Sequence, residues 1–530
     1  MSVVLRGGGL TLEDVIRVAR DLEAVSLSDE ARQRIRQSRD LVGQVLGSGT
    51  PVYGINTGFG KLKNRQISSG ELEHLQINLL RSHAVGVGDP LATEAVRAMG
   101  LLRAESLAIG VSGVHEELVE ALIDLLNHKV HPLVPAQGSV GASGDLAPLA
   151  HYALVLIGEG EAEWQGEHLP GGEALARAGL KPHRLGAKDG LALINGTQQS
   201  TALMALCLED LDRLLTAAVA SSALSLEGLL GSILPFDDRV AAVRPHPGHR
   251  WVAARVRDLV AGSQLGSSHE DCDRLQDPYS LRCIPQVLGT SLDGFSFARQ
   301  IVGTELGSAT DNPLVFPETD AGKAWRERVI SAGNFHAQPI SLAADTACIA
   351  LGPLTGMAER RIDLLLDENR SGLPAFLTSE PGLHSGMMLL QYMAAALTSE
   401  NKVLAHPASV DSIPTSAGME DHVSMAPWAA RKLVQSVKNS RYVIAAEMVA
   451  AAQALEARKP LRPGVGTAAL YTAIRERVRP LEKDRPLAKE VEAISEWIAK
   501  GGPGSVLRSC LEQWPSPWQG TISAVIGGKG

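Results

Sequence analysis

The sequence predicts a mainly α-helical protein: a large bundle of long helices with a small loop-rich N-terminal part. Hydrophobic residues make up 45% of the 530 residues, but aromatic residues make up only 4%. This composition, rich in Ala and Leu, suits closely packed helices better than a large β-sheet. Residues 201–230 are apolar on nearly all sides, as expected for a helix surrounded by other helices.

The first helices are marked by their start and stop signals. Thr11 and Asp14 form a capping pair, and Ser28 begins a second helix that should run to about residue 46, where the GSGTP segment at 47–51 stops it. The apolar face of the first helix is expected to consist of Leu12, Val15, Ile16, Ala19 and Leu22. Further helices are expected at 70–83, 92–108 and 115–128. We expect β structure only in residues 164–188, which are richer in Gly, Pro and charge.

The later part of the chain is dominated by long helical patterns. These are expected at residues 201–230, 281–306, 334–366, 385–404 and 428–455. Helices this apolar on several faces usually need partners beyond their own chain, so we expect oligomerisation. We divide the chain into an N-terminal part (1–196), a central long-helix bundle (197–480) and a C-terminal extension (481–530).

Charge and cysteine usage argue against several classes of protein. The net charge of −9 and the lack of a basic cluster disfavour nucleic-acid binding. The N-terminus lacks the apolar core of a signal peptide, and no uninterrupted apolar run is long enough to span a bilayer. Five scattered cysteines without a Cys-x-x-Cys pair disfavour disulfides and a zinc site, so we expect a cytoplasmic protein and assign no metal-binding residues. Whether a divalent ion is used stays open.

The segment 135–151 carries the main chemical signal. At its centre, the amide nitrogen of Gly144 can attack the carbonyl carbon of Ala142, and dehydration at Ser143 would leave an exocyclic methylidene. The product would be the electrophile 4-methylidene-imidazol-5-one (MIO), and Asp145 could move protons during its formation. A turn between helices is the simpler interpretation of an isolated Ala-Ser-Gly. A phosphate loop and a nucleophile elbow are disfavoured because the spacing fits neither motif.

The full motif GSVGASGDLAPLAH at 138–151 closely resembles the signature of the aromatic amino-acid ammonia-lyases and aminomutases. The resemblance implies MIO formed autocatalytically from Ala142-Ser143-Gly144, elimination of ammonia from an α-amino acid, and an elongated helical bundle of the fumarase-like type. It also implies a homotetramer with active sites shared between subunits. Other segments that match the family in order are INGT at 194–197, QDPYSLR at 276–282, TDNPL at 310–314, GNFH at 333–336 and SIPTSAGMEDHVSM at 412–425.

The same resemblance assigns roles to the candidate residues. It implies that Tyr53 is the base for the β-hydrogen and that Arg282 holds the substrate carboxylate. Asn195 and Tyr279 are expected to donate hydrogen bonds to the ring oxygen. The expected remainder of the pocket consists of Gln276, Asn312 and Phe335. Whether the ring engages the amine or the aromatic group stays open.

The residues expected to contact the substrate side chain favour an imidazole group as that side chain. The pair Ser82-His83 resembles the histidine-specific members of the family, with His83 and Glu420 as polar partners and Met388 packed on the ring face. Met419 and Gln338 depart from the usual pattern of those members. We therefore expect conversion of L-histidine to trans-urocanate and ammonia. The alternatives are a tyrosine or phenylalanine lyase or aminomutase, or a silent helical assembly protein with an uncyclised tripeptide.

Overall fold

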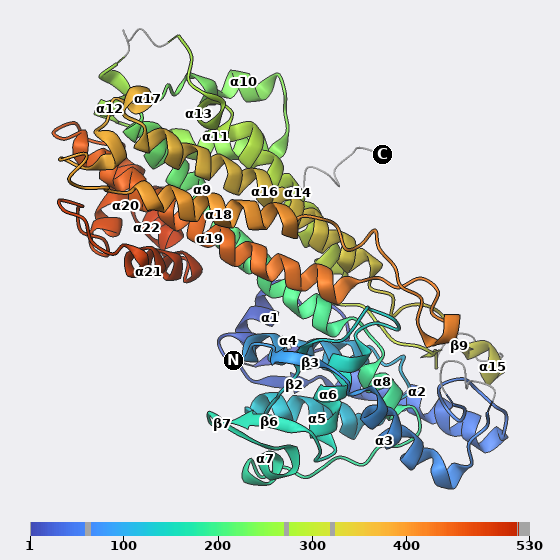
Figure 1. Cartoon of the computed structure of the whole chain (residues 1–530). Coiled ribbons are helices and arrows are strands. Elements are labelled where there is room, and N and C mark those ends of the chain that lie inside the picture. The colour runs from blue at the N-terminus through green and yellow to red at the C-terminus, as the bar shows by residue number, and fades with distance from the viewer. Residues whose placement is uncertain (1, 59–64, 270–274, 318–323, 517, 519–530) are drawn as a thin grey trace. The chain divides into compact units, whose positions relative to one another are not determined.

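The structure is a computed structural model of the chain, and it describes residues 2–58, 65–269, 275–317, 324–516 and 518. It confirms the mainly α-helical class (Figure 1). The residues cluster into two compact units. Unit 1 comprises Met1–Leu206, Gln300–Asp345 and Pro407–Arg431, and unit 2 comprises Cys207–Arg299, Thr346–His406 and Lys432–Gly530. The three consecutive parts proposed from the sequence stay a prediction.

The first two helices begin where their caps predict. Helix α1 (Leu12–Ala19) opens with a reciprocal capping box between Thr11 and Asp14. Helix α2 (Asp29–Ser48) is capped by the Ser28 side chain and ends at Gly49 in the left-handed conformation. Leu22, expected on the face of α1, instead lies beyond its end with a φ of 58° and is exposed. The expectation for Leu22 was wrong because the helix stops before the residue that would complete the pattern.

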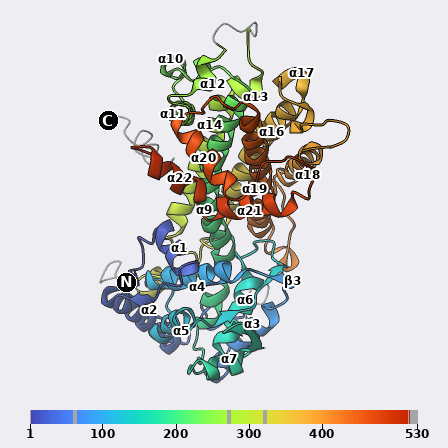
Figure 2. The ribbon, with the colours of Figure 1, turned by 90° about the vertical axis from the view of Figure 1, so that its left-hand side faces the viewer.

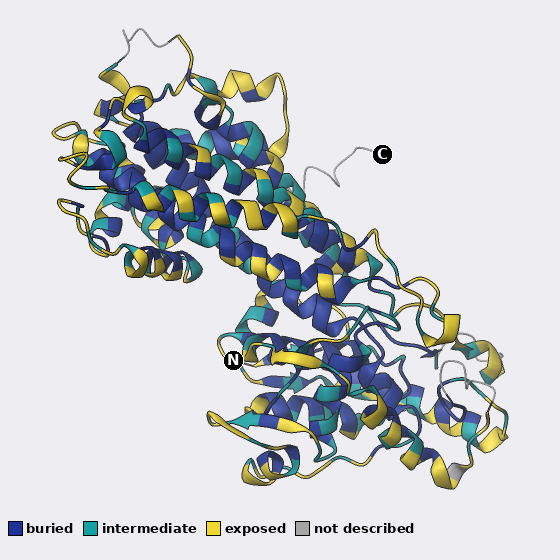
Figure 3. Ribbon diagram, viewed as in Figure 1, coloured by how far each residue is buried: buried dark blue, intermediate teal, exposed yellow. Residues whose placement is uncertain are grey.

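Unit 1 is organised around α4 (Thr93–Ala108), which is buried at every position from Ala95 onward (Figure 3). Helices α1 and α5 (Glu116–Asn127) pack against it. The buried guanidinium of Arg97 donates to the Val18 carbonyl near the end of α1 and to the Leu126 carbonyl near the end of α5. A cation at these positions satisfies carbonyl groups that have no partner within their own helices.

Short strands occur in more places than the sequence indicates. The hairpin of β6 (Glu161–Trp164) and β7 (Glu167–Pro170) lies at the edge of the expected region. The other pairs are β1 (Val3–Leu5) with β2 (Val25–Leu27), β3 (Val87–Pro90) with β5 (Pro135–Gln137), β4 (His131–Pro132) with β6, and β8 (Leu314–Val315) with β9 (Val329–Ile330). The expectation of β structure in a single region was wrong, because strands of two to four residues are too short to show an alternating pattern.

Unit 2 contains most of the length of several long helices, which run side by side in Figures 1 and 2. Their bounds are α9 (Gln198–Gly228), α14 (Ile284–Glu305), α16 (Gln338–Leu366), α18 (Met388–Leu404) and α19 (Ala426–Ala457). Buried Glu447 of α19 pairs with Arg361 of α16 and accepts hydrogen bonds from Ser221 and Ser225 of α9. This network satisfies a carboxylate that would otherwise be costly to bury.

The remaining helices are short. In unit 1 they are α3 (Leu72–His83), α6 (Leu146–Leu156), α7 (Gly171–Arg177), α8 (Asp189–Ile194) and α15 (Trp325–Arg328). In unit 2 they are α10 (Asp238–Ala242), α11 (Pro247–Leu259), α12 (Gln264–Ser267), α13 (Tyr279–Arg282), α17 (Glu368–Ser371), α20 (Val465–Arg475), α21 (Ala488–Ala499) and α22 (Gly502–Cys510). Single turns of 3₁₀ helix lie at Ser69–Glu71, Leu234–Phe236, Ala375–Leu377 and Ser416–Gly418.

Helix α16 is long and mostly apolar. Among the described residues, it is the one helix long and apolar enough to cross a membrane by length and composition, although Asp345 and Glu359 interrupt its apolar sequence. However, 56% of its most apolar window is buried inside the protein, as in a core helix. No disulfide joins the described cysteines, which are Cys207, Cys283, Cys348 and Cys510, and Cys272 lies outside the described residues.

Candidate active site

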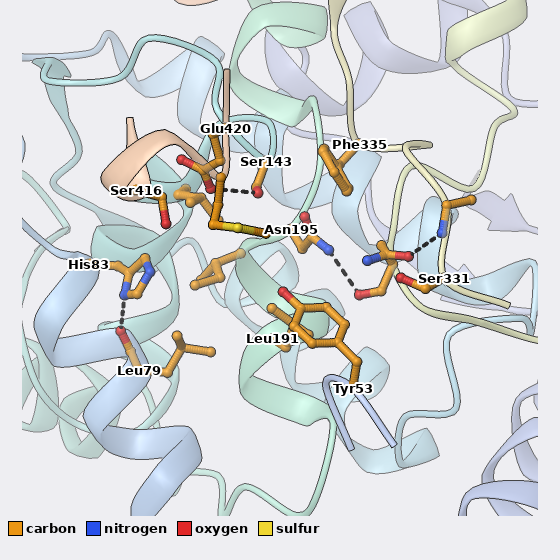
Figure 4. Close-up of a pocket in the computed structure, with 15 residues that line it drawn as sticks. Tyr53, Leu79, His83, Ser143, Leu191, Asn195, Ser331, Phe335, Ser416 and Glu420 are labelled. Carbon is orange, nitrogen blue, oxygen red and sulfur yellow. Dashed lines mark hydrogen bonds between the residues drawn. The ribbon is translucent and has the colours of Figure 1, made fainter. Parts of the chain in front are cut away.

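A cavity of about 520 Å³ lies in unit 1 and brings together many of the predicted residues (Figure 4). Those predicted from the sequence are Tyr53, His83, Ser143, Asn195, Asn312, Phe335 and Glu420. The other lining residues are Leu79, Leu146, Leu191, Ile194, Ser331, Ala332, Ser416 and Met419. Residues from distant parts of the sequence, between Tyr53 and Glu420, thus line one cavity that is large enough for an amino acid.

Ser143 stands on a tight turn directly before α6. Its φ is 52° and that of Gly144 is 81°, so two consecutive residues adopt left-handed conformations. A Cβ on Gly144 would lie 2.2 Å from the carbonyl oxygen of Gly196, and the amide of Asp145 donates to the same oxygen at 2.7 Å. Glycine at 144 is therefore required both by the backbone conformation and by the close approach of the segment around Gly196.

Asp145 directly precedes α6, and its side chain is completely buried against the start of α9. It accepts hydrogen bonds from the backbone amide of Ser200 at 2.8 Å and from the Ser200 hydroxyl at 2.9 Å. Burial raises the pKa of Asp145 to about 7 against the lowering effect of these hydrogen bonds, and the half-buried Glu305 adds a further raising influence. Asp145 therefore anchors the turn to the start of α9 as a group that titrates near neutrality.

A second segment, 415–425, holds the turn from the other side. Glu420 accepts a hydrogen bond from the Ser143 hydroxyl at 3.2 Å through Oε1 and from the Thr415 hydroxyl at 2.6 Å through Oε2 (Figure 4 shows the first). The amide of Met425 donates to the carbonyl of Val140 at 2.9 Å. Side-chain and backbone contacts therefore connect this segment at two places to the loop that carries Ser143.

Asn195 directly follows α8, and its side-chain oxygen accepts no hydrogen bond within the described residues. Its side-chain NH₂ donates to the backbone carbonyl of Asn312 at 2.9 Å, and Arg103 donates to the backbone carbonyl of Asn195 at 2.9 Å. The Oδ1 atom of Asn195 is buried and has no hydrogen-bond partner among the described residues. A buried acceptor without a partner costs free energy unless a bound group supplies the donor.

A buried ion pair lies beside the two asparagines. The ammonium group of Lys188 is 2.7 Å from Oδ2 of Asp311, and both side chains are fully buried. Lys188 precedes α8 with a φ of 76°, and Oδ1 of Asp311 accepts from the amide of Asn312 at 2.7 Å. Burial lowers the pKa of Lys188 against the raising effect of Asp311. The pair thereby connects the start of the helix that carries Asn195 to the backbone at Asn312.

His83 is the last residue of α3 and faces the cavity (Figure 4). Its Nδ1 lies 2.8 Å from the Leu79 carbonyl. A carbonyl can only accept, so Nδ1 carries the proton and Nε2 of the neutral ring is an acceptor. Burial lowers the pKa of His83 despite the opposing influence of the Leu79 carbonyl and of Glu420, which favours this neutral form.

Tyr53 reaches the cavity from the glycine-rich segment 52–60. A Cβ on the next residue, Gly54, would lie 2.7 Å from Cδ of Pro313 and 2.8 Å from a methyl group of Leu191, and the φ of Gly54 is 74°. Glycine at 54 therefore lets this segment lie close to the cavity wall. Phe59 and Gly60, which close this segment in the sequence, lie outside the described residues.

Four predicted residues belong to unit 2 and do not line this cavity: Gln276, Tyr279, Arg282 and Met388. Arg282 donates to the Asp277 carbonyl at 3.0 Å, and its guanidinium lies 4.4 Å from the centre of the Tyr279 ring, which is 69% exposed. Met388 lines another cavity of about 380 Å³ together with Phe376 and Tyr392. The structure thus separates the predicted residues into two groups.

Some residues that line the cavity but were not predicted from the sequence could have been found from their helical spacing. Leu79 precedes His83 by one helical turn, and Leu191 precedes Asn195 by four residues, so both share a face with a predicted residue. Ser331 and Ala332 lie in an irregular segment without a motif.

Gln338 does not line the cavity, and its side chain donates to the Ser409 carbonyl at 3.1 Å.

A sequence profile of the aromatic amino acid lyase family matches residues 10–476, and the chain belongs to that family. Among individual relatives, the chain is 49% identical to a histidine ammonia-lyase of Myxococcus xanthus over 507 residues, covering 96% of this chain and 98% of the relative. Its fold is similar to the crystal structure of histidine ammonia-lyase from Trypanosoma cruzi, with a TM-score of 0.90, 37% identity and coverage of 98% and 97% of the two chains. It is also similar to tyrosine aminomutase from Streptomyces globisporus, with a TM-score of 0.90, 35% identity and coverage of 97% and 100%.

Proposed function

We propose that the protein is a histidine ammonia-lyase, which converts L-histidine to trans-urocanate and ammonia. The observation that carries the proposal is that His83, whose Nε2 is an acceptor, and the carboxylate of Glu420 line the same cavity as Ser143. The relative from Myxococcus xanthus is a histidine ammonia-lyase, which supports the same substrate.

The residues around Ser143 fit the MIO group. The turn with left-handed Ser143 and Gly144 has no room for a side chain at 144, and Ser143 itself lines the cavity. We infer that Ala142-Ser143-Gly144 forms this group. When formed, it supplies an electrophile that makes departure of ammonia possible.

Polar side chains would recognise the substrate imidazole. Neutral imidazole has one N–H donor and one nitrogen acceptor. Nε2 of His83 would accept from the donor, and Glu420 would accept from the second nitrogen when that nitrogen is protonated. Leu79 and Met419 provide apolar surface on the same lining, which suits the faces of the ring.

Tyr53 and Asn195 would act on the amino-acid backbone. Tyr53 is proposed as the base that removes the β-hydrogen. Asn195 would keep its NH₂ group on the Asn312 carbonyl, so its free Oδ1 would accept a hydrogen bond from the substrate ammonium. This role differs from the donation to the ring oxygen expected from the sequence, which requires the second hydrogen of the same NH₂ group.

The residues of unit 2 are proposed to act in a homotetramer. Arg282 would bind the substrate carboxylate, Tyr279 would donate to the ring oxygen, and Gln276 and Met388 would complete a pocket of a neighbouring subunit. Tyr279 is largely exposed in the single chain, as a residue available to a partner would be. The location proposed for the assembly is the cytoplasm.

The substrate is tested by assaying the purified protein on L-histidine, L-tyrosine and L-phenylalanine. We expect urocanate and ammonia from L-histidine and at least a hundredfold lower kcat/KM on the other two. The competing function is an aminomutase, because the Streptomyces globisporus enzyme has the same fold. A β-amino acid or coumarate as the main product, without urocanate, would contradict the proposal.

A further inference from the structure

We propose that Glu420 has an earlier role, as a catalytic residue in the maturation of the chain: it moves the proton that allows the Ser143 hydroxyl to leave. The proposal rests on the proposed function, because it requires that Ala142-Ser143-Gly144 cyclises. It concerns the dehydration at Ser143, for which the sequence suggested Asp145 as the residue that moves protons. The observation behind it is that the Ser143 hydroxyl donates its hydrogen bond to this carboxylate.

The geometry of Glu420 is suited to act on that hydroxyl. Its Oε1 lies 3.2 Å from Oγ of Ser143, whereas its Oε2 is held at 2.6 Å by the hydroxyl of Thr415. Thr415 also pairs with Glu420 through the backbone in both directions, at 3.0 Å and 3.3 Å. One oxygen of the carboxylate therefore fixes its orientation and leaves the other on the reacting atom, within the distance expected of a group that transfers a proton.

The surrounding segment maintains this contact over a long sequence separation. The Ser424 hydroxyl lies 3.4 Å from the Gly141 carbonyl, and a Cβ on Gly141 would lie 2.2 Å from that hydroxyl oxygen. Ser416 and Ala417 have φ values of 51° and 53°, which are unfavourable for residues with a side chain. Strained backbone persists where the surroundings enforce it and is common at functional sites. The segment 415–425 is thus positioned against the loop that must react.

The other carboxylate beside the tripeptide is oriented differently. Both oxygens of Asp145 accept hydrogen bonds from Ser200, one from its amide and one from its hydroxyl. No hydrogen bond between Asp145 and the Ser143 hydroxyl is present in the described part of the chain. Asp145 is adjacent in sequence, but the hydroxyl that must depart is directed at Glu420.

The proposed step balances in atoms and charge. Dehydration at Ser143 breaks the Cα–H and Cβ–O bonds, and the electron pair of the Cα–H bond forms the new carbon–carbon double bond. One proton is lost from Cα and one is gained by Oγ, which leaves as water. The Glu420 carboxylate takes up the proton released at Cα and then gives it to Oγ as the Cβ–O bond breaks, so Glu420 ends as the carboxylate that it was at the start. The other water comes from the Ala142 carbonyl after attack by the Gly144 nitrogen.

The same step would prepare Glu420 for its later role. Once the Ser143 hydroxyl has left, Oε1 has lost the donor that occupied it, while Oε2 is still held by Thr415. The freed oxygen lines the cavity and is available to the substrate. Maturation and substrate binding would then use one oxygen atom in succession.

The test is the intact mass of freshly purified full-length variants. Ser143→Ala gives the reference mass without a ring. In Glu420→Gln, which keeps the size of the side chain but removes its proton transfer, we expect the fraction of chains lighter by two waters to fall at least tenfold relative to the unaltered protein. Asp421→Asn is the matched control: it makes the same carboxyl-to-amide change at the exposed neighbouring residue, which does not line the cavity, and its chains should show the full mass loss. Complete loss of two waters in Glu420→Gln would overturn the proposal.

A second measurement keeps the test valid if Glu420→Gln is insoluble. Glu420→Asp retains a carboxyl on a shorter arm, so mass loss should proceed more slowly after a pulse of expression than in the unaltered protein; an equal rate would contradict the proposal. Failure of the proposed substrate is separate. A ring in the unaltered protein without urocanate production would remove the substrate assignment but leave the role of Glu420 intact.

Discussion

Gly144 lies so close to Gly196 that a Cβ on Gly144 would be 2.2 Å from the Gly196 carbonyl oxygen. The two residues also form a parallel bridge, and the amide of the following residue, Asp145, donates to that same oxygen. The turn at Ser143 and Gly144 therefore packs against the backbone that directly follows Asn195. Any change that separates these two backbones would disturb the turn and the side chain of Asn195 together.

The first prediction concerns this contact. Gly144→Ala should prevent the loss of two waters and abolish activity, because an alanine at a φ of 81° is strained and collides with a backbone carbonyl. Its thermal midpoint should also fall by several degrees. The control is Gly303→Ala, where nothing lies within 4 Å of the added atom. Intact mass and thermal unfolding measure both effects. A fully matured Gly144→Ala would contradict the predicted turn.

The second prediction tests how the substrate is recognised. His83→Leu removes the acceptor Nε2 and leaves one imidazole donor without its partner, at a cost of about 1–3 kcal/mol. We expect kcat/KM on L-histidine to fall by about 10- to 100-fold. Arg81→Ala on the same helix removes an exposed pair with Glu159 and should change it less than threefold. Steady-state kinetics decide, and an unchanged kcat/KM in His83→Leu would remove His83 from the recognition of the substrate.

The third prediction is a pH dependence of stability. The pKa of Asp145 is about 7 in the folded protein and 3.8 ordinarily, so the folded state binds the proton more tightly. Its contribution is therefore fully present below pH 4 and is lost as pH rises to about 7, by about 1.4 kcal/mol for each unit of pH. In a Ser143→Ala background, Asp145→Asn should remove this slope from the free energy of unfolding. Equal slopes with and without Asp145 would show that its pKa is not raised.

The fourth prediction concerns the buried pair of Lys188 and Asp311. Lys188→Met leaves the Asp311 carboxylate buried without its cation, which should cost about 3–5 kcal/mol of stability. Replacing both residues in Lys188→Met/Asp311→Leu should recover part of that loss, since no charge is left unpaired. Chemical unfolding of the single and double variants measures the difference. A double variant less stable than both single variants would contradict this account.

Much of the fold could be predicted because its signals are local. The capping pair at Thr11 and the serine cap at Ser28 place the starts of α1 and α2, and the length of the apolar patterns places α9 and α19. Leu22 and the two- to four-residue strands could not be predicted in this way. A helix end depends on where tertiary packing stops it, and the shortest strands are defined by a partner distant in sequence.

The candidate site was predictable where a motif named its chemistry. Ser143, Asn195 and His83 each stand in a segment that resembles the family, and the structure brings them to one cavity. Ser331 and Ala332 were not predictable, because small residues in irregular segments carry no pattern. The contact between Ser143 and Glu420 was also beyond the sequence, since it joins residues 277 positions apart. The roles assigned to the residues of unit 2 stay predictions.

The most direct test of the account is the mass of the peptide that contains residues 142–144, measured in enzyme shown to be fully active on L-histidine. We predict that this peptide is lighter than its sequence by two waters, as required for a ring formed from Ala142-Ser143-Gly144. An unmodified peptide with an intact Ser143 hydroxyl, recovered from fully active enzyme, would contradict the central claim.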